Sequence, residues 1–218
     1  SGAKGFKDAK GTAAQFKFPH NIATSPDGKV LYVADADNYR IRQIETASGK
    51  VTTLAGSGRD GSEDGVAASF KTLCGLALSP DSKQLFVAEE GGNKIRAVSV
   101  AVGAATTVAG SGEKKSEEGS GAAASFYIPQ GLALSPDGKR LASGGQGGEI
   151  WVWRDPICSA ASGGHRDPYT HTLPTSEPRA VPSTGIIMSH KDNTFKTIKT
   201  VWNYIFCIRK VKQVFSIK

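Results

Sequence analysis

The chain has 218 residues, of which 39% are apolar, enough for the packed core of one ordinary domain. Glycine is abundant, which favours many short strands and turns over long helices. The net charge of +7 is uneven: residues 1–154 carry 18 Lys and Arg against 16 Asp and Glu, whereas residues 155–218 carry 9 against 4. The repeats that fill the first part are therefore close to neutral, which argues against nucleic-acid binding inferred from overall charge.

Three cysteines, Cys74, Cys158 and Cys207, lie far apart and form no CxxC pair. An odd count without framework spacing favours a reducing compartment over a disulfide scaffold, and therefore favours the cytoplasm. No run of residues is long and apolar enough for a membrane span.

One unit of sequence recurs along the chain. Phe16, Phe70 and Phe126 are 54 and 56 residues apart, and the segments that begin at Ser25, Ser79 and Ser135 (SPDG, SPDS and SPDG) keep the same spacing. "TTLAGSG" at 52–58 returns as "TTVAGSG" at 106–112. Such a period is the signature of a repeat architecture.

Within the first unit, β-branched and apolar residues predict four strands, at about 20–24, 30–34, 40–45 and 51–55. Turn residues separate them: Pro26-Asp27-Gly28, Asp37-Asn38 and Ser48-Gly49.

A four-stranded sheet that is apolar on both faces must pack against copies of itself, which favours a β-propeller. We therefore predict an all-β fold, an incomplete β-propeller of about two and a half to three blades, over residues 1–154. The repeat units are about 1–55, 56–109 and 110–154. Complete propellers have about four to eight blades, so we expect a piece of a longer propeller, or a chain that closes its ring only with further blades or by self-association.

The motifs "AGSGRDGSEDGVAASF", "SPDG" and "LYVAD..N.RIR.I" followed by "VTTLAG" resemble NHL repeats. Leu73 departs from this pattern where Pro19 and Pro129 stand in the other units. The third unit, "LASGGQGGEIWVWRDP", resembles the ending of a WD-type repeat, with Trp153 near the place of Ile44.

After Asp155 the repeat stops. Residues 155–218 read as a Ser-, Thr-, Pro- and Gly-rich linker followed by a basic extension with mixed helix and strand signals. We expect this extension to be disordered or to cap the propeller edge; membrane or partner binding is the alternative.

The topology of such blades places the loop between the second and third strands, and the long loop between units, on one face. We call it the loop face and predict that it binds the partner. The residues expected there are Asp35, Asp37, Asn38, Tyr39 and Arg40, with Glu89, Glu90, Asn93 and Lys94 in the second unit.

A structural role competes with this prediction. The pair Asp35 and Arg42 recurs as Glu89 and Arg96, and a carboxylate and guanidinium repeated in each blade favour hydrogen bonds within the scaffold. "RDGSEDG" (59–65) gathers Asp60, Glu63 and Asp64, oxygen ligands that calcium prefers. The same places in the first unit read Phe6, Ala9 and Lys10, so we interpret this segment as a solvated acidic loop rather than a metal site.

His20 opens the first, innermost strand, and Cys74 and Gln130 occupy its place in the other units. We expect the three at the mouth of the central channel. The repeats resemble those of propellers that act as lyases, in which His residues surround a metal in the central channel. This resemblance makes His20 and Cys74 alternative metal ligands. Zinc needs about three or four such ligands, and we predict no metal and no cofactor.

The leading prediction is a non-catalytic NHL-repeat scaffold that binds a protein partner through its loop face. One alternative is a propeller enzyme of the lyase or lactonase-like hydrolase type with a channel metal. A further alternative is RNA binding, for which the near-neutral repeats show no basic footprint.

Overall fold

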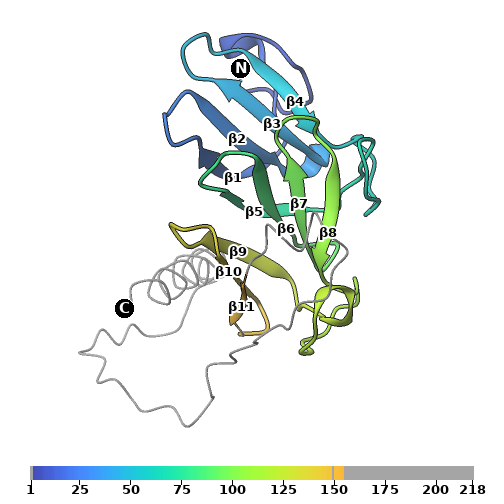
Figure 1. The fold of residues 1–218 in the computed structure, drawn as a ribbon. Coiled ribbons are helices and arrows are strands. Elements are labelled where there is room, and N and C mark those ends of the chain that lie inside the picture. Colours follow the sequence, from blue (N-terminus) through green and yellow to red (C-terminus); the bar gives the residue numbers. More distant parts are fainter. Residues whose placement is uncertain (1, 149, 155–218) are drawn as a thin grey trace, which may run out of the picture.

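The computed structural model describes residues 2–148 and 150–154, which form three small antiparallel sheets (Figure 1). Blade 1 holds β1 (Pro19–Thr24), β2 (Val30–Asp35), β3 (Arg40–Glu45) and β4 (Val51–Ala55). Blade 2 holds β5 (Leu73–Leu78), β6 (Gln84–Glu89), β7 (Lys94–Ser99) and β8 (Ala105–Ala109). Blade 3 holds β9 (Pro129–Leu134), β10 (Arg140–Gly145) and β11 (Ile150–Arg154). The predicted all-β, incomplete propeller is confirmed.

The strands follow the predicted bounds within a residue because the Ser-Pro-Asp turn fixes the register of each blade. Ser25 Oγ donates to Asp27 Oδ1 at 2.7 Å and accepts from the Val30 amide at 2.9 Å. The Gly28 amide closes the turn on the Ser25 carbonyl. The same bonds recur at Ser79 and Ser135.

The blades lie side by side through their first strands, with β1 against β5 and β5 against β9 (Figure 1). The approach is close at Gly75, because a Cβ there would collide with the Gln130 carbonyl oxygen. Only glycine fits such a contact between backbones. The first strands of the three blades are therefore the inner strands of the arc.

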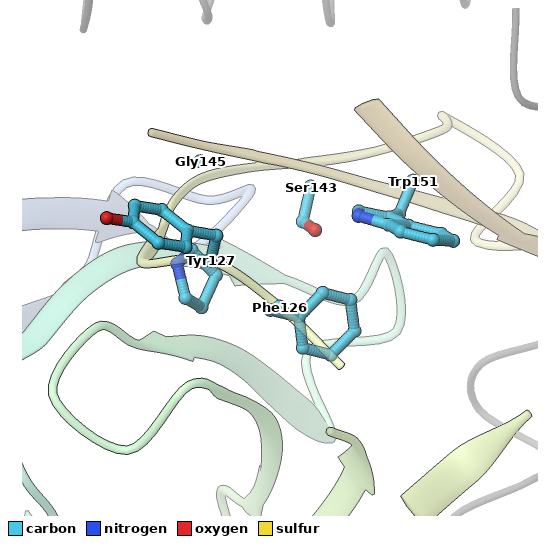
Figure 2. A pocket seen from close by; sticks show the side chains of 6 residues that line it. Phe126, Tyr127, Ser143, Gly145 and Trp151 are labelled. Carbon is cyan, nitrogen blue, oxygen red and sulfur yellow. The ribbon is translucent and has the colours of Figure 1, made fainter. Parts of the chain in front are cut away.

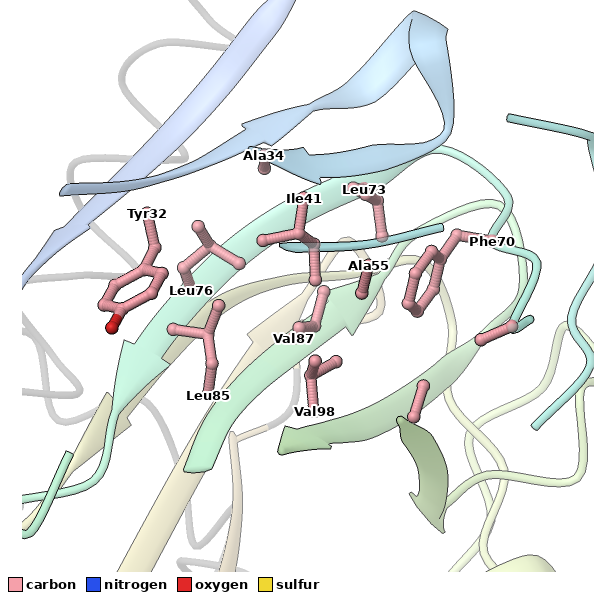
Figure 3. Close-up of a cluster of buried hydrophobic side chains, with 12 residues drawn as sticks. Tyr32, Ala34, Ile41, Ala55, Phe70, Leu73, Leu76, Leu85, Val87 and Val98 are labelled. Atoms are coloured by element: carbon pink, nitrogen blue, oxygen red, sulfur yellow. The ribbon is translucent and has the colours of Figure 1, made fainter. Parts of the chain in front are cut away.

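Two apolar clusters lie between the blades. Figure 3 shows the first, where Tyr32, Ala34, Ile41 and Ala55 of blade 1 meet a face of blade 2. That face of blade 2 is built from Phe70, Leu73, Leu76, Leu85, Val87, Val98 and Ala105. The second cluster packs the opposite face of blade 2 on Phe126, Leu141 and Trp151. Blade 2 thus uses one face to pack on blade 1 and the opposite face to pack on blade 3.

The predicted extension, residues 155–218, lies outside the described residues. Within residues 2–148 and 150–154 we find no helix with the length and apolar character needed to cross a membrane.

Candidate functional site at the loop face

The structure removes four residues from the predicted binding face because they are buried. Asp35 and Glu89 have no exposed surface, and Asn38 and Asn93 are less than a tenth exposed. Their side chains bond inside the protein: Asn38 Nδ2 donates to Asp35 Oδ2 and to the Gly5 carbonyl, both at 2.8 Å. Asn93 Oδ1 accepts from the Ile128 amide at 3.2 Å. These side chains anchor the long loops to the blades, and the binding prediction is wrong for them.

The recurring Arg is also structural. Arg42 is buried and donates to Asp35 Oδ2 at 2.8 Å, and Arg96 forms the same ion pair with Glu89. The guanidinium carbon lies 4.8 Å from the Phe16 ring centroid in blade 1, and 5.2 Å from that of Phe70 in blade 2. Each guanidinium is therefore neutralised by a carboxylate and stacked on an aromatic ring.

The acidic loop at 59–65 is not simply solvated. Asp64 accepts from Arg96 Nη2 at 2.7 Å and from the Thr107 amide at 3.0 Å. Asp8 makes the matching bonds to Arg42 and Thr53 in blade 1. Asp8 is thus the counterpart of Asp64, and the assignment of Lys10 to that place is wrong. The N-terminal loop holds two more residues than the second loop before the shared Phe, which displaces an alignment made on Phe16.

The other predicted loop-face residues reach solvent to different degrees. Asp37 is exposed and lies 3.8 Å from Lys17 Nζ. Tyr39 is half-buried, with a left-handed φ of 53°. Arg40 is half-buried and donates to the Ser57 carbonyl at 3.0 Å. Glu90 and Lys94 are half-buried as well. These five residues stay candidates for binding.

Two exposed phenylalanines at the loop face escaped the sequence analysis. Phe6 is 44% exposed, and the Arg40 guanidinium stacks 3.8 Å from its ring centroid. Phe18 is 61% exposed and holds a φ of 54°, a conformation that costs a bulky residue about 1–2 kcal/mol. Ser62 and Thr72 take their places in blade 2, so blade 2 lacks this aromatic pair. The sequence held a signal for this pair, namely two aromatic residues in the first unit where the second unit has a serine and a threonine.

The structure links the three predicted channel-mouth residues, which come from β1, β5 and β9. Cys74 Sγ lies 3.2 Å from His20 Nδ1, and Gln130 Nε2 donates to Glu90 Oε2 at 3.3 Å. Cys74 is fully buried, whereas His20 is exposed. Glu90, which was predicted for the loop face, therefore lies beside two of the predicted channel-mouth residues, Cys74 and Gln130.

The electrostatics of this cluster do not favour chemistry at Cys74. Burial, with the charge of the neighbouring Glu90, raises the pKa of the Cys74 thiol well above its usual range. The thiolate is the nucleophile and the metal ligand, so a thiol held protonated is a poor candidate for either role. Within the described part of the chain, no three His, Cys, Asp or Glu side chains are grouped to hold a metal ion.

Blade 3 lacks the buried ion pair. The strand register places Trp151 opposite Ser143, as Arg96 lies opposite Val87, so Trp151 takes the place of the Arg. Gly145 takes the place of Glu89. Figure 2 shows the Trp151 indole edge-on to Phe126, with ring centroids 5.9 Å apart, beside a small hollow that Ser143 and Gly145 also line. Trp153 lies opposite Leu141, as Ile44 lies opposite Leu31, which confirms its predicted place.

Comparison with protein families and curated proteins supports both repeat types. The family model "WD domain, G-beta repeat" matches residues 128–154, which confirms the WD-type ending. The chain is 30% identical over 140 residues to NHL repeat-containing protein 2 of Bos taurus (59% of this chain, 19% of that protein). It is 31% identical over 143 residues to Protein SUPPRESSOR OF QUENCHING 1, chloroplastic, of Arabidopsis thaliana (63% of this chain). The chain spans only 14% of that second protein.

Solved structures support the fold alone. A structural genomics protein of unknown function from Bacteroides thetaiotaomicron superimposes with a TM-score of 0.52 at 17% identity, over 68% of this chain and 36% of that one. An auxiliary nutrient binding protein from the same organism gives 0.51 at 17% identity, over 61% and 36%.

Proposed function

Because this chain carries repeats of the NHL type, we propose that it is a non-catalytic scaffold that binds a protein partner through the loop face of blade 1. The observation that carries the proposal is the exposed pair Phe6 and Phe18 among basic side chains. Aromatic and Arg side chains are the residues that contribute most to binding at protein interfaces.

Hydrogen bonds that hold the loop backbone in place favour binding at this surface. The Asn38 side chain ties the loop to Gly5, and the Lys17 amide donates to Asp35 Oδ1 at 2.7 Å. Phe6 and Phe18 are therefore presented from backbone that is bonded to a buried ion pair. A partner that docks here orders few additional groups, which lowers the entropic cost of binding.

The loop faces of the first two units also differ in charge. Lys4, Lys17 and Arg40 accompany the aromatic pair, and Asp37 is the exposed carboxylate beside them. In blade 2 the counterpart of Lys4 is Asp60, which pairs with Phe70 in the same kind of backbone bridge. Blade 1 is therefore the more basic surface, which favours a partner segment with acidic residues.

Site-specific photo-crosslinking tests the proposal. Benzoylphenylalanine replaces Phe18 at the loop face in one variant and Lys83 at the opposite face in the matched control. We expect discrete protein adducts from position 18 and none from position 83. Equal labelling from both faces, or adducts whose added mass is removed by nuclease, would contradict binding of a protein at the loop face.

A further inference from the structure

The outer edge of blade 1 carries three exposed lysines, Lys7, Lys10 and Lys50. The N-terminal loop runs beside β4 at this edge (Figure 1), and the Val51 amide donates to the Ala9 carbonyl at 2.8 Å. This pairing places Lys10 directly opposite Lys50, and Lys7 precedes Lys10 in the same loop. We call the three lysines the basic rim.

Two carboxylates lie beside the basic rim, and each is engaged by other groups. Asp8 accepts from Arg42 Nη2 and from the Thr53 amide. The Glu45 carboxylate accepts from Ser48 Oγ at 2.9 Å. The lysines that form ion pairs in the described part of the chain are Lys17, Lys29, Lys83 and Lys115. Within residues 2–148 and 150–154, no ion pair therefore neutralises the basic rim.

Blade 2 shows that the fold does not need lysines at this edge. Its loop makes the same kind of bonds, since the Ala105 amide donates to the Gly65 carbonyl at 2.9 Å and Asp64 takes the place of Asp8. Counted from these bonds, the counterparts of Lys7, Lys10 and Lys50 are Glu63, Val66 and Ala104. The first two counterparts are exposed although blade 2 packs against a blade on each side. The exposure of this edge therefore does not depend on which blades flank it.

The basic rim also carries a cost. Lys10 and Lys50 face each other as like charges, an arrangement that destabilises a strand pair. A local feature that costs stability and has no compensating contact is expected at a functional site. An anionic group bound between the two lysines would offset their repulsion.

We propose that the basic rim binds a partner segment rich in Asp and Glu. Complementary charge is the property that selects such a segment and speeds its association. A peptide fits better than a nucleic acid, because the rim is short, Asp8 and Glu45 interrupt it, and the repeats as a whole are nearly neutral. The proposal goes beyond the loop-face partner, since the basic rim shares no residue with the aromatic pair Phe6 and Phe18.

Fluorescence anisotropy of a labelled oligoglutamate peptide, titrated with the full chain at several salt concentrations, tests the proposal. We expect saturable binding that weakens as the salt concentration rises, and no binding of an oligoglutamine peptide of the same length. The Lys7→Glu/Lys10→Glu variant should raise the dissociation constant at least about tenfold, because it reverses two of the rim charges. The matched control Lys83→Glu/Lys139→Glu makes the same change in net charge at two Ser-Pro-Asp turns and should leave the dissociation constant within about twofold.

A single substitution separates binding from folding. Lys10→Glu places a carboxylate opposite Lys50, so its thermal unfolding midpoint should stay at or above that of the parent chain while peptide binding weakens. Phe18→Ala should leave peptide binding unchanged, so failure of this proposal is distinguishable from failure of the loop-face proposal.

Three outcomes would overturn the proposal. The first is an oligoglutamate peptide that does not bind. The second is equal weakening of peptide binding by the two double variants, which would assign the effect to net charge alone. The third is tighter binding of an oligouridylate than of the peptide, lost in Lys7→Glu/Lys10→Glu, which would assign the basic rim to nucleic acid.

Discussion

Blades 2 and 3 fill the same place in the repeat with opposite chemistry. In blade 2 the buried Glu89 and Arg96 form an ion pair, and the guanidinium lies over the Phe70 ring. In blade 3 these two positions hold Gly145 and Trp151, and the indole meets the Phe126 ring edge-on. Ser143 of blade 3 takes the place of Val87 of blade 2.

The comparison shows that a flat group lies against the shared Phe in both blades, and that this group need not carry charge. A buried ion pair often contributes little net stability compared with apolar residues of similar volume, although breaking it by removing one partner is costly. Blade 3 has exchanged the pair for an aromatic contact and is left with a hollow. The hydrogen bonds that Arg42 donates to Asp8 and Arg96 donates to Asp64 have no arginine donor in blade 3, because Trp151 takes the place of the arginine.

The largest expected effect comes from breaking the pair in blade 2. Arg96→Met leaves the buried Glu89 carboxylate without its partner, so we expect a loss of about 3–5 kcal/mol in the free energy of unfolding. Chemical denaturation measures the loss. The double variant Glu89→Gln/Arg96→Met should be more stable than Arg96→Met alone. Losses that simply add in the double variant would contradict a coupled pair.

The reverse exchange in blade 3 should also be costly. Trp151→Arg buries a guanidinium where Gly145 supplies no carboxylate, and we expect a loss of about 2–4 kcal/mol. Trp151→Phe keeps an aromatic ring and should lose less, about 1–2 kcal/mol. Thermal and denaturant unfolding of both variants provide the measurement, and equal stability of the two would show that charge does not matter at this place.

A smaller gain is expected at Ser143. Its Oγ is buried and has no hydrogen-bond partner among the described residues. Ser143→Val restores the residue of blade 2, fills part of the hollow and removes the unpaired hydroxyl, so we expect a gain of about 1 kcal/mol. Val87→Ser is the matched control and should destabilise. A loss of stability in Ser143→Val would mean that the hydroxyl has a role that the comparison misses.

The smallest effect concerns the turn that all three blades share. The hydrogen bond from Ser25 lowers the pKa of the Asp27 carboxyl, as those from Ser79 and Ser135 do for Asp81 and Asp137. A lowered folded-state pKa contributes stability above the unfolded-state pKa, near about 3.9, and this contribution is lost as the pH falls through the folded-state pKa.

Ser25→Ala should therefore raise the pKa of Asp27 toward its ordinary value and weaken this acid dependence for blade 1. Carboxyl-carbon NMR titration measures the shift. Asp81 and Asp137 in the same molecule are the controls and should keep their lowered pKa values. An unchanged pKa of Asp27 in Ser25→Ala would contradict this role of Ser25 and assign the lowered pKa to the backbone amide of Lys29.

The sequence predicted the strands well because turn residues and apolar alternation mark each one locally. Ser25 and its repeats place the second strand, and Leu31, Leu85 and Leu141 hold equivalent positions in three sheets. The place of Trp153 followed from the same spacing. Local pattern is informative wherever the chain keeps one period.

The candidate site was predicted less well because its contacts depend on loop length and burial. The two-residue difference between loops hid the equivalence of Asp8 and Asp64. A recurring Asp35 or Glu89 looks alike in sequence whether it faces solvent or an arginine, and only packing decides. The exposure of Phe6 and Phe18 depends on which side of the loop each ring occupies, which spacing alone does not reveal.

A designed disulfide between blades 1 and 2 tests the central claim, that the repeats stack through their inner strands. The test variant carries His20→Cys in a chain with Cys158→Ser and Cys207→Ser. Residue 20 should oxidise to a bond with Cys74, because β1 packs beside β5 and the Nδ1 atom of His20 lies 3.2 Å from Cys74 Sγ. Thr24→Cys, at the other end of β1, should not. Mass spectrometry that finds the 20–74 bridge supports the stacked arc, and failure to form it, or equal bridging from position 24, contradicts it.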